Sequence, residues 1–89
     1  MTYIVELKHV RSKKRFWAEI ERGIPVPDYF GENLDALYDV LSETAEETEI
    51  IFRHAEKCAN YLPAYIPRLK RMCKDLSEEI PHLTFIFEE

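Results

Sequence analysis

The sequence has little glycine and little cysteine, and it lacks long hydrophobic runs. Only two of its 89 residues are glycine and two are cysteine, whereas 46% are hydrophobic. This composition excludes a disordered chain, and two cysteines without CxxC spacing exclude a disulfide framework. The longest apolar stretches span about five residues, far short of the roughly 20 that cross a membrane. We therefore expect one domain, residues 1–89, with a single core.

The N-terminal segment also lacks the features of a targeting sequence. Met1–Leu7 has neither the basic start nor the long apolar run of a signal peptide. Cys58 and Cys73 are expected to be free thiols, as in proteins of the reducing cytoplasm. These observations predict a cytoplasmic protein without membrane association.

Positive charge is absent from a long central stretch. Between Ile24 and Phe52 there is no Lys, Arg or His, although the stretch holds 8 of the 17 acidic residues. The rest of the chain has 12 basic and 9 acidic residues, so the formal net charge of −5 is unevenly distributed. Such a field attracts basic partners and repels phosphates, which argues against direct nucleic-acid binding there. A solvated acidic surface that serves solubility is the alternative.

Strand-like and helix-like segments alternate along the chain. The expected strands are Thr2–Leu7, Glu49–Arg53 and Leu83–Phe87. The expected helices are Lys13–Arg22, Leu34–Ser42, Ala55–Tyr61 and Pro67–Glu79. This alternation predicts an α/β protein with a small, mostly parallel sheet covered by helices. Because Ile50–Phe52 and Leu83–Phe87 are nearly continuous apolar runs, we expect their strands to be buried on both faces.

Helix boundaries and the intervening loop can be assigned from capping and turn residues. Ser12 is expected to cap the first helix, with Gly23 as its stop, and Asn33 to cap the second. Pro25 and the following Pro27 favour an extended loop between them. In the same loop, Gly31 permits a tight or left-handed turn. Trp17 shares a helix face with Phe16 and Ile20, so we interpret it as a packing residue rather than a ligand-stacking one.

The second expected helix separates its leucines from its acids. At 100° per residue, Leu34, Leu37 and Leu41 lie on one side, whereas Asp35 and Asp39 lie on another. Like charges one turn apart destabilise a helix by a few tenths of a kcal/mol. Asp35 regains some of this through the helix dipole, but Asp39, with Glu43 continuing the stripe, is too far along to do so. The pattern indicates a cation supplied from outside.

Aromatic residues accompany these carboxylates. Tyr29 and Phe30 precede the helix and Tyr38 lies on it. Aromatic side chains beside charges that become desolvated are typical of interface hot spots. A loop held by two prolines loses little entropy on binding. The segment from Pro27 to Asp39 is therefore predicted to bind a basic partner protein.

This segment resembles a known family. Residues Val26–Leu41, VPDYFGENLDALYDVL, are similar to the central motif of the barstar family, intracellular inhibitors of barnase-type ribonucleases. Chain length, element order and the hydrophobic last strand are also similar. The resemblance implies a three-stranded parallel sheet covered by about four helices. It further implies that the loop and second helix block the active site of a small, basic, secreted ribonuclease in a one-to-one complex.

The resemblance also implies individual roles. Tyr29 would cover the mouth of the pocket, Asp39 would occupy the place of a substrate phosphate, and Asp35 would accept hydrogen bonds at the rim. Gly31 would allow close backbone approach. The predicted partner-binding residues are Tyr29, Phe30, Gly31, Asn33, Leu34, Asp35, Tyr38, Asp39, Glu43 and Asp75.

Two positions depart from the family pattern or lack a motif. Tyr38 stands where the best-known member has tryptophan, a change that can tune the choice of partner. The family has an interface acid on the helix before the last strand, for which Asp75 is the nearest candidate, with Glu78 behind it.

The sequence allows three other interpretations. Asp35 and Asp39 could form a metal or acid–base pair in an enzyme, but no Ser, Cys or His stands near them. His9, His54 and His82 also lack metal-ligand spacing, so we predict neither catalysis nor a cofactor nor a metal. An interaction or immunity module for a different basic toxin stays open.

The third interpretation concerns basic residues near the start of the first helix. This cluster could suggest nucleic acid, although Glu6 and Glu19 flank it and a solvated helix start is favoured. It comprises Lys8, Arg11, Lys13, Lys14 and Arg15. We expect the free protein to be monomeric.

Overall fold

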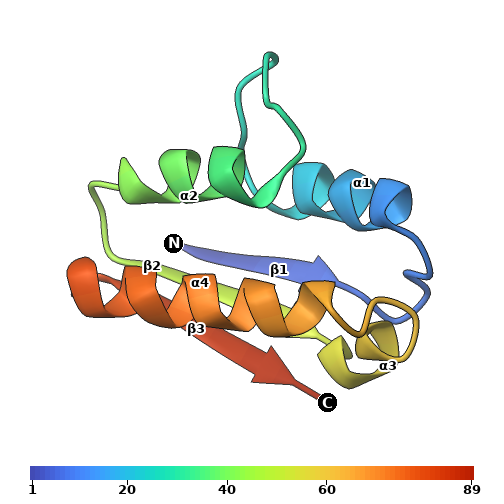
Figure 1. The fold of residues 1–89 in the computed structure, drawn as a ribbon. Helices are drawn as coiled ribbons and strands as arrows, with labels where there is room; N and C mark the ends of the chain where they lie inside the picture. Colours follow the sequence, from blue (N-terminus) through green and yellow to red (C-terminus); the bar gives the residue numbers. More distant parts are fainter.

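The computed structural model describes residues 1–89 and contains three strands and four helices (Figure 1). The strands are β1 (Thr2–Glu6), β2 (Thr48–Arg53) and β3 (Leu83–Glu88). The helices are α1 (Lys13–Gly23), α2 (Leu34–Ser42), α3 (Ala55–Ala59) and α4 (Tyr65–Glu79). The element types and their order are those expected from the sequence.

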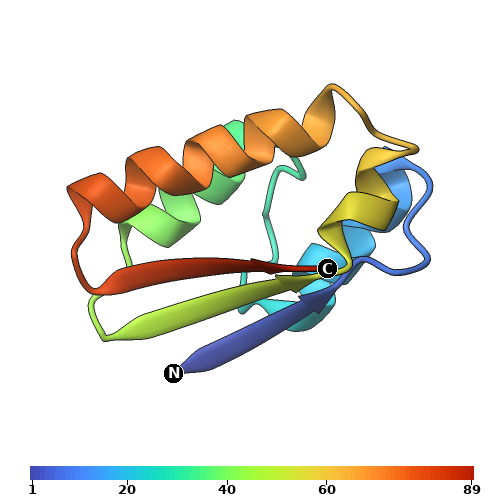
Figure 2. The ribbon, with the colours of Figure 1, turned by 90° about the horizontal axis from the view of Figure 1, so that it is seen from below.

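The strands form one parallel sheet in the order β1-β2-β3. Its register places Val5, Phe52 and Phe87 in one row across the three strands. This row faces the helices, and Val5 and Phe52 are fully buried. Figure 2 shows α4 running along β3, and α2 packs against α4. The predicted small parallel α/β architecture is confirmed.

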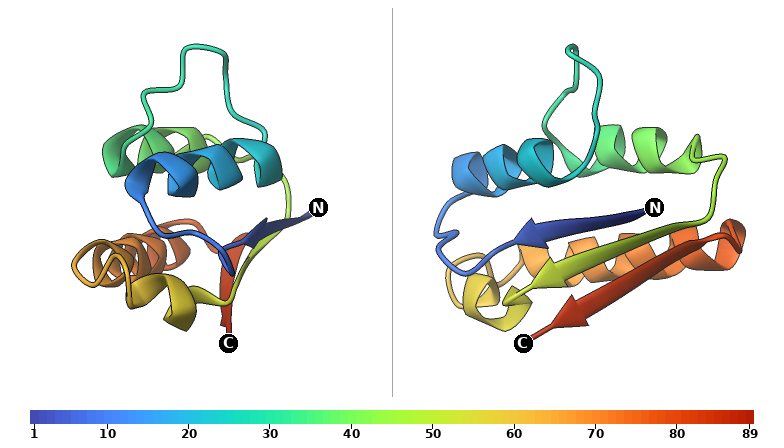
Figure 3. Two further views of the ribbon diagram at one scale, coloured as in Figure 1. Left: turned by 90° about the vertical axis from the view of Figure 1, so that its right-hand side faces the viewer. Right: turned by 180° about the vertical axis from the view of Figure 1, so that it is seen from behind.

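The other face of the sheet is open, and the prediction of strands buried on both faces was wrong. Viewed from behind, the strands lie in front of α4 (Figure 3, right). Ile4, Ile51 and Ile86 form a row on this open face, and Ile4 is 50% exposed. Helix α1 packs on β1 and α4 packs on β3, and the helical layer buries only one side of the three strands. The strand segments looked continuously apolar because isoleucines on the uncovered side alternate with the buried residues of the other side.

The core contains 20 buried residues, and α1 supplies its aromatic centre. Phe16 and Trp17 pack edge to face at 4.9 Å between ring centroids. Both are buried, together with Ile20, which confirms Trp17 as a packing residue. The helix begins as predicted, because the Ser12 hydroxyl accepts a hydrogen bond from the Arg15 N–H. Caps of this kind contribute about 1 kcal/mol.

Gly23 has a different role from the one predicted. It is the last residue of α1 rather than its stop, and its φ is not positive. A Cβ at this position would lie 2.5 Å from the Ile4 carbonyl oxygen and 3.1 Å from a Val5 methyl carbon. Glycine is therefore required because α1 passes directly against the backbone of β1.

Helix α4 begins two residues earlier than predicted. It starts at Tyr65, so Pro67 lies in its first turn. Proline is tolerated there because the N–H groups of the first turn have no partner within the helix. Leu69, Cys73 and Leu76 are buried. Helix α3, in contrast, ends at Ala59 instead of Tyr61.

The two cysteines are free and buried. Burial raises the pKa of the Cys58 thiol to about 11 and also raises the pKa of Cys73. Such thiols are protonated at neutral pH and react slowly. None of the helices has the length and apolar character required to cross a membrane.

Candidate partner-binding site

The connection between α1 and α2, residues 24–33, projects away from the sheet (Figure 1). It is attached at its base by Phe30, whose ring packs edge to face on Trp17 at 5.6 Å. The Phe30 N–H donates to the Pro27 carbonyl at 3.0 Å, which closes a turn. Tyr29, between these two, is 88% exposed. The loop thus holds one aromatic side chain inside and presents the next one outside.

The tight turn before α2 lies at Glu32 rather than at Gly31. Glu32 has φ 51°, whereas neither glycine has a positive φ, so Glu32, and not Gly31, adopts the left-handed conformation in this turn. Asn33 stabilises this turn from both sides. Its amide nitrogen donates to the Gly31 carbonyl at 3.1 Å, and its amide oxygen accepts from the Ala36 N–H at 2.8 Å. The predicted N-cap of α2 is confirmed.

The two faces of α2 are separated as the helical phase predicted. Leu37 and Leu41 are buried, whereas Asp35 and Asp39 are exposed. Leu34 also belongs to the core, with only 9% of its surface exposed. The expected contact of Leu34 with a partner stays a prediction. The exposed side of α2 therefore carries carboxylates rather than leucines.

A hollow of about 430 Å³ lies between the loop and α2. Tyr29 and Gly31 line it from the loop, and Asp39 and Glu43 line it from α2. An aromatic ring and two carboxylates around one cavity form a suitable environment for a cationic side chain. We call this surface the loop–α2 face; it comprises residues 27–33 and the exposed side chains of α2.

Helix α4 extends this face at one side. The Tyr38 hydroxyl donates to the Glu79 carboxylate at 2.6 Å. This hydrogen bond raises the pKa of Tyr38, as do desolvation and the nearby charges of Glu79, Asp75 and Asp39. The sequence prediction included Asp75 on this side and missed Glu79. Glu79 lies one helical turn after Asp75 on the same face of α4, and this spacing could have identified it from the sequence.

Like charges also meet at the base of the loop. A hydrogen bond between the carboxyl groups of Glu21, on α1, and Glu32 raises the pKa of Glu21. Glu32 also occupies a left-handed conformation that side chains other than glycine rarely adopt. The carboxyl groups of Glu21 and Glu32 therefore lie close together in the fold.

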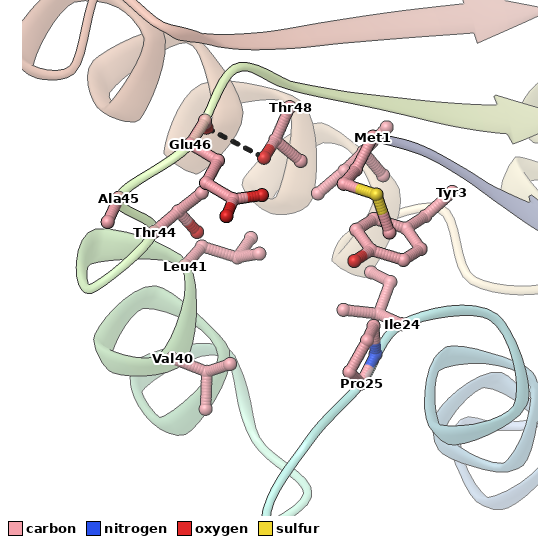
Figure 4. A pocket seen from close by; sticks show the side chains of 11 residues that line it. Met1, Tyr3, Ile24, Pro25, Val40, Leu41, Thr44, Ala45, Glu46 and Thr48 are labelled. Carbon is pink, nitrogen blue, oxygen red and sulfur yellow. Dashed lines mark hydrogen bonds between the residues drawn. The ribbon is translucent and has the colours of Figure 1, made fainter.

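The rest of the cation-free stretch has a different environment. Glu46 stands over an open hollow of about 310 Å³ lined by residues including Tyr3, Ile24 and Leu41 (Figure 4). The backbone here is hydrogen-bonded within the protein: the Glu46 carbonyl accepts a hydrogen bond from the Thr48 hydroxyl at 2.9 Å. No aromatic side chain in this region approaches the exposure of Tyr29.

The three histidines are scattered. The His54 ring contacts the Glu6 carboxylate at 2.6 Å, and the His82 ring contacts the Thr44 carbonyl at 2.6 Å. His9 is exposed. No group of three or more His, Cys, Asp or Glu side chains is arranged to hold a metal ion.

The fold and this face define a small parallel α/β protein that presents a preformed acidic loop and helix. The family comparison agrees with that class. The model of the family described as Barstar (barnase inhibitor) matches residues 1–88, so the chain belongs to this family. Its members are inhibitors, and this protein is not an enzyme. A search of curated proteins found no match to the chain.

Proposed function

We propose that the protein inhibits a secreted barnase-type ribonuclease by inserting its loop–α2 face into the active site of the enzyme. The observation that carries this proposal is the hollow shared by Tyr29 and Asp39. It joins an exposed aromatic ring to unneutralised carboxylates in a chain whose family is that of a barnase inhibitor. A ribonuclease active site binds phosphates, so its cationic side chains are suitable partners for these carboxylates.

Four residues of the face, and Asp75 beside it, have proposed roles. Asp39 takes the place of a substrate phosphate and pairs with the arginines and histidine of the enzyme. Tyr29 covers the mouth of the pocket and contacts the catalytic histidine. Asp35 accepts hydrogen bonds from a basic residue at the rim, and Gly31 allows the two backbones to approach closely. Asp75, on α4, adds a carboxylate beside Tyr38.

The structure of the face supports tight binding. Asn33 and the Phe30–Trp17 contact hold the loop in place, so little conformational entropy remains to be lost on association. The eight acids of residues 24–52 attract a basic enzyme from a distance. The complex is one-to-one, with a standard interface of about 1,600 Å² in total. It forms in the cytoplasm, where it protects the producing cell.

A ribonuclease inhibition assay tests the proposal. Increasing amounts of the protein are added to a fixed concentration of barnase, and cleavage of a fluorescent RNA substrate is followed. We expect activity to fall linearly to zero at one equivalent of inhibitor. An unchanged cleavage rate at a large excess of the protein, with barnase and with other members of its enzyme family, would disprove the proposed function.

A further inference from the structure

Another hollow lies beside the loop–α2 face, and part of its wall is positively charged. It measures about 470 Å³ and lies where the first turns of α1, α2 and α4 meet. Glu32 and Asp35 line one part of it. The residues that supply its positive charge are Lys13, Lys14 and Arg68. We call these three residues the basic rim.

Tyr65 holds part of the basic rim in place. Its ring is buried, with 8% exposed, and packs edge to face on Phe16 at 5.5 Å. The Lys13 ammonium lies 4.8 Å from the centre of this ring, and the Arg68 guanidinium carbon lies 5.8 Å from it. Two cations from different helices therefore share one fixed aromatic platform. Cation–π contacts of this kind orient the cations without neutralising them.

The rim cations have no acidic partner within the protein. Arg15, Arg22, Arg53 and Lys70 form ion pairs with glutamates, but Lys13, Lys14 and Arg68 form none. They stay unpaired even though Glu32 and Asp35 line the same hollow. Their exposed charges are therefore available to a group from outside.

Building on the proposed function, we propose that the basic rim recognises an acidic side chain of the ribonuclease next to its basic pocket. The surface of the ribonuclease would then carry an acidic residue directly beside the basic residue that contacts Asp35. A uniformly basic enzyme would be repelled by Lys13, Lys14 and Arg68. The rim thus selects among basic partners, because complementarity requires charges of both signs in the correct order.

A carboxylate fits this position better than a nucleic acid. A nucleic-acid strand carries a charge on every phosphate, and the neighbouring Asp35 and the acids of α2 would repel its continuation. A single carboxylate beside a cationic pocket is complementary to this protein, which has acidic side chains around the 430 Å³ hollow and the basic rim at the neighbouring 470 Å³ hollow. An ion pair between a rim cation and this carboxylate is exposed, so its contribution to the binding free energy is modest and depends on salt.

Charge reversal tests the rim. In Lys13→Glu/Arg68→Glu, both new carboxylates lie in the first turn of a helix, where the dipole favours them, so the fold is expected to persist. Affinity for barnase is measured by surface plasmon resonance at several salt concentrations. The matched control, Lys57→Glu/Lys74→Glu, changes the net charge equally through two exposed lysines that form no ion pair.

We expect the rim variant to bind about tenfold more weakly than the control variant at low salt. The sign of the effect is decisive. If the rim variant binds as well as the control or more tightly, the rim faces neutral or basic groups and the proposal is wrong.

A second experiment does not depend on the ribonuclease. Triglutamate peptide is titrated into the free ¹⁵N-labelled protein, and amide shifts are followed by NMR. We expect shifts at Lys13, Lys14 and Arg68 that disappear in the rim variant. Absent shifts, or a stronger response to a single-stranded RNA oligomer at the same residues, would overturn the proposal. If barnase and related enzymes do not bind the wild-type protein, the proposed function fails, and this titration alone decides the rim.

Discussion

The two halves of the cation-free stretch are both acidic but differ in structure. The first half, the loop and α2, surrounds a hollow with Tyr29, Asp39 and Glu43. The second half, residues 44–49, connects α2 to β2 and begins that strand. There the Met1 amino group donates to the Glu47 carbonyl at 2.9 Å, and the Glu49 N–H donates to the Met1 carbonyl at 2.8 Å.

This difference shows why a count of acids does not locate a binding site. In the first half, the polar backbone of the turn is satisfied locally by Asn33. The loop can therefore leave the body of the protein and carry exposed side chains. In the second half, the backbone begins the sheet, and we expect the acids to contribute only to the long-range field. The following predictions test this contrast, from the largest expected effect to the smallest.

The largest contrast is expected between Asp39→Ala and Glu46→Ala. Loss of Asp39 leaves cationic groups of the enzyme buried without a partner and weakens binding by about 2–5 kcal/mol, a range to which measurements on the barnase–barstar pair contribute. Glu46→Ala is expected to change binding by less than about 0.5 kcal/mol. Isothermal titration calorimetry with barnase measures both. Equal, small effects would remove the distinction between the two halves.

Although Asp39→Ala is expected to weaken binding, it is expected to stabilise the free protein. Because Asp39 lies one turn from both Asp35 and Glu43, its removal relieves like-charge repulsion along α2. We expect the free energy of unfolding in urea to rise by a few tenths of a kcal/mol. A marked loss of stability would mean that Asp39 serves the fold, contrary to the proposed role.

The next effect separates two adjacent aromatic residues of the loop. Tyr29→Ala is expected to weaken binding by about 2 kcal/mol and to leave stability within about 0.5 kcal/mol, since the side chain is 88% exposed. Phe30→Ala is the matched control. It removes the contact with Trp17 and should lower the free energy of unfolding by about 1–2 kcal/mol. Thermal and urea unfolding combined with calorimetry distinguish the two; a reversed pattern would contradict the loop geometry.

A smaller effect is expected at the junction of α2 and α4. Tyr38→Phe removes the hydrogen bond to Glu79 and should weaken binding about two- to tenfold, because the ring is no longer held beside Asp39. Glu79→Gln keeps an acceptor and removes the charge. It should therefore retain most of the affinity.

The same hydrogen bond predicts a pH dependence. The folded pKa of Tyr38 is raised above its unfolded value, so its contribution to stability is fully present below about pH 10. That contribution is lost as pH rises through the folded pKa. Ultraviolet titration of the wild type and Glu79→Gln measures this shift. An identical tyrosine titration in the two proteins would show that the bond does not form in solution.

The smallest effect concerns the second half as a whole. Glu46→Gln/Glu47→Gln/Glu49→Gln is expected to slow association with barnase about two- to threefold at low salt and to leave dissociation unchanged. At 0.5 M salt the difference should vanish because screening is then effective over a few ångströms. Stopped-flow fluorescence measures the association rate. A changed dissociation rate would place these glutamates inside the interface.

Local patterns predicted most of the fold because they depend on residues close together in the chain. Ser12 and Asn33 cap their helices as expected, and the leucine and aspartate faces of α2 separate by helical phase. The VPDYFGENLDALYDVL motif indicated the family that the comparison then confirmed. These features require only periodicity, capping and a contiguous motif.

Other features could not be predicted because they depend on how distant segments pack. Gly23 looked like a helix stop, but its lack of a side chain is required by β1 lying against it. The isoleucines of the sheet looked buried, yet no element covers their face. A segment distant in sequence determines the environment of Gly23, whereas the isoleucines are exposed because no such segment covers them.

The sequence by itself determined the acidic character of the central stretch, the caps of its helix and the family to which the chain belongs. Only the tertiary structure placed Glu79 beside Tyr38 and gathered Lys13, Lys14 and Arg68 next to Asp35. The physical reason is distance along the chain. Helical phase orders residues three or four apart, whereas the meeting of three helix starts depends on how α1, α2 and α4 pack on one face of a short sheet.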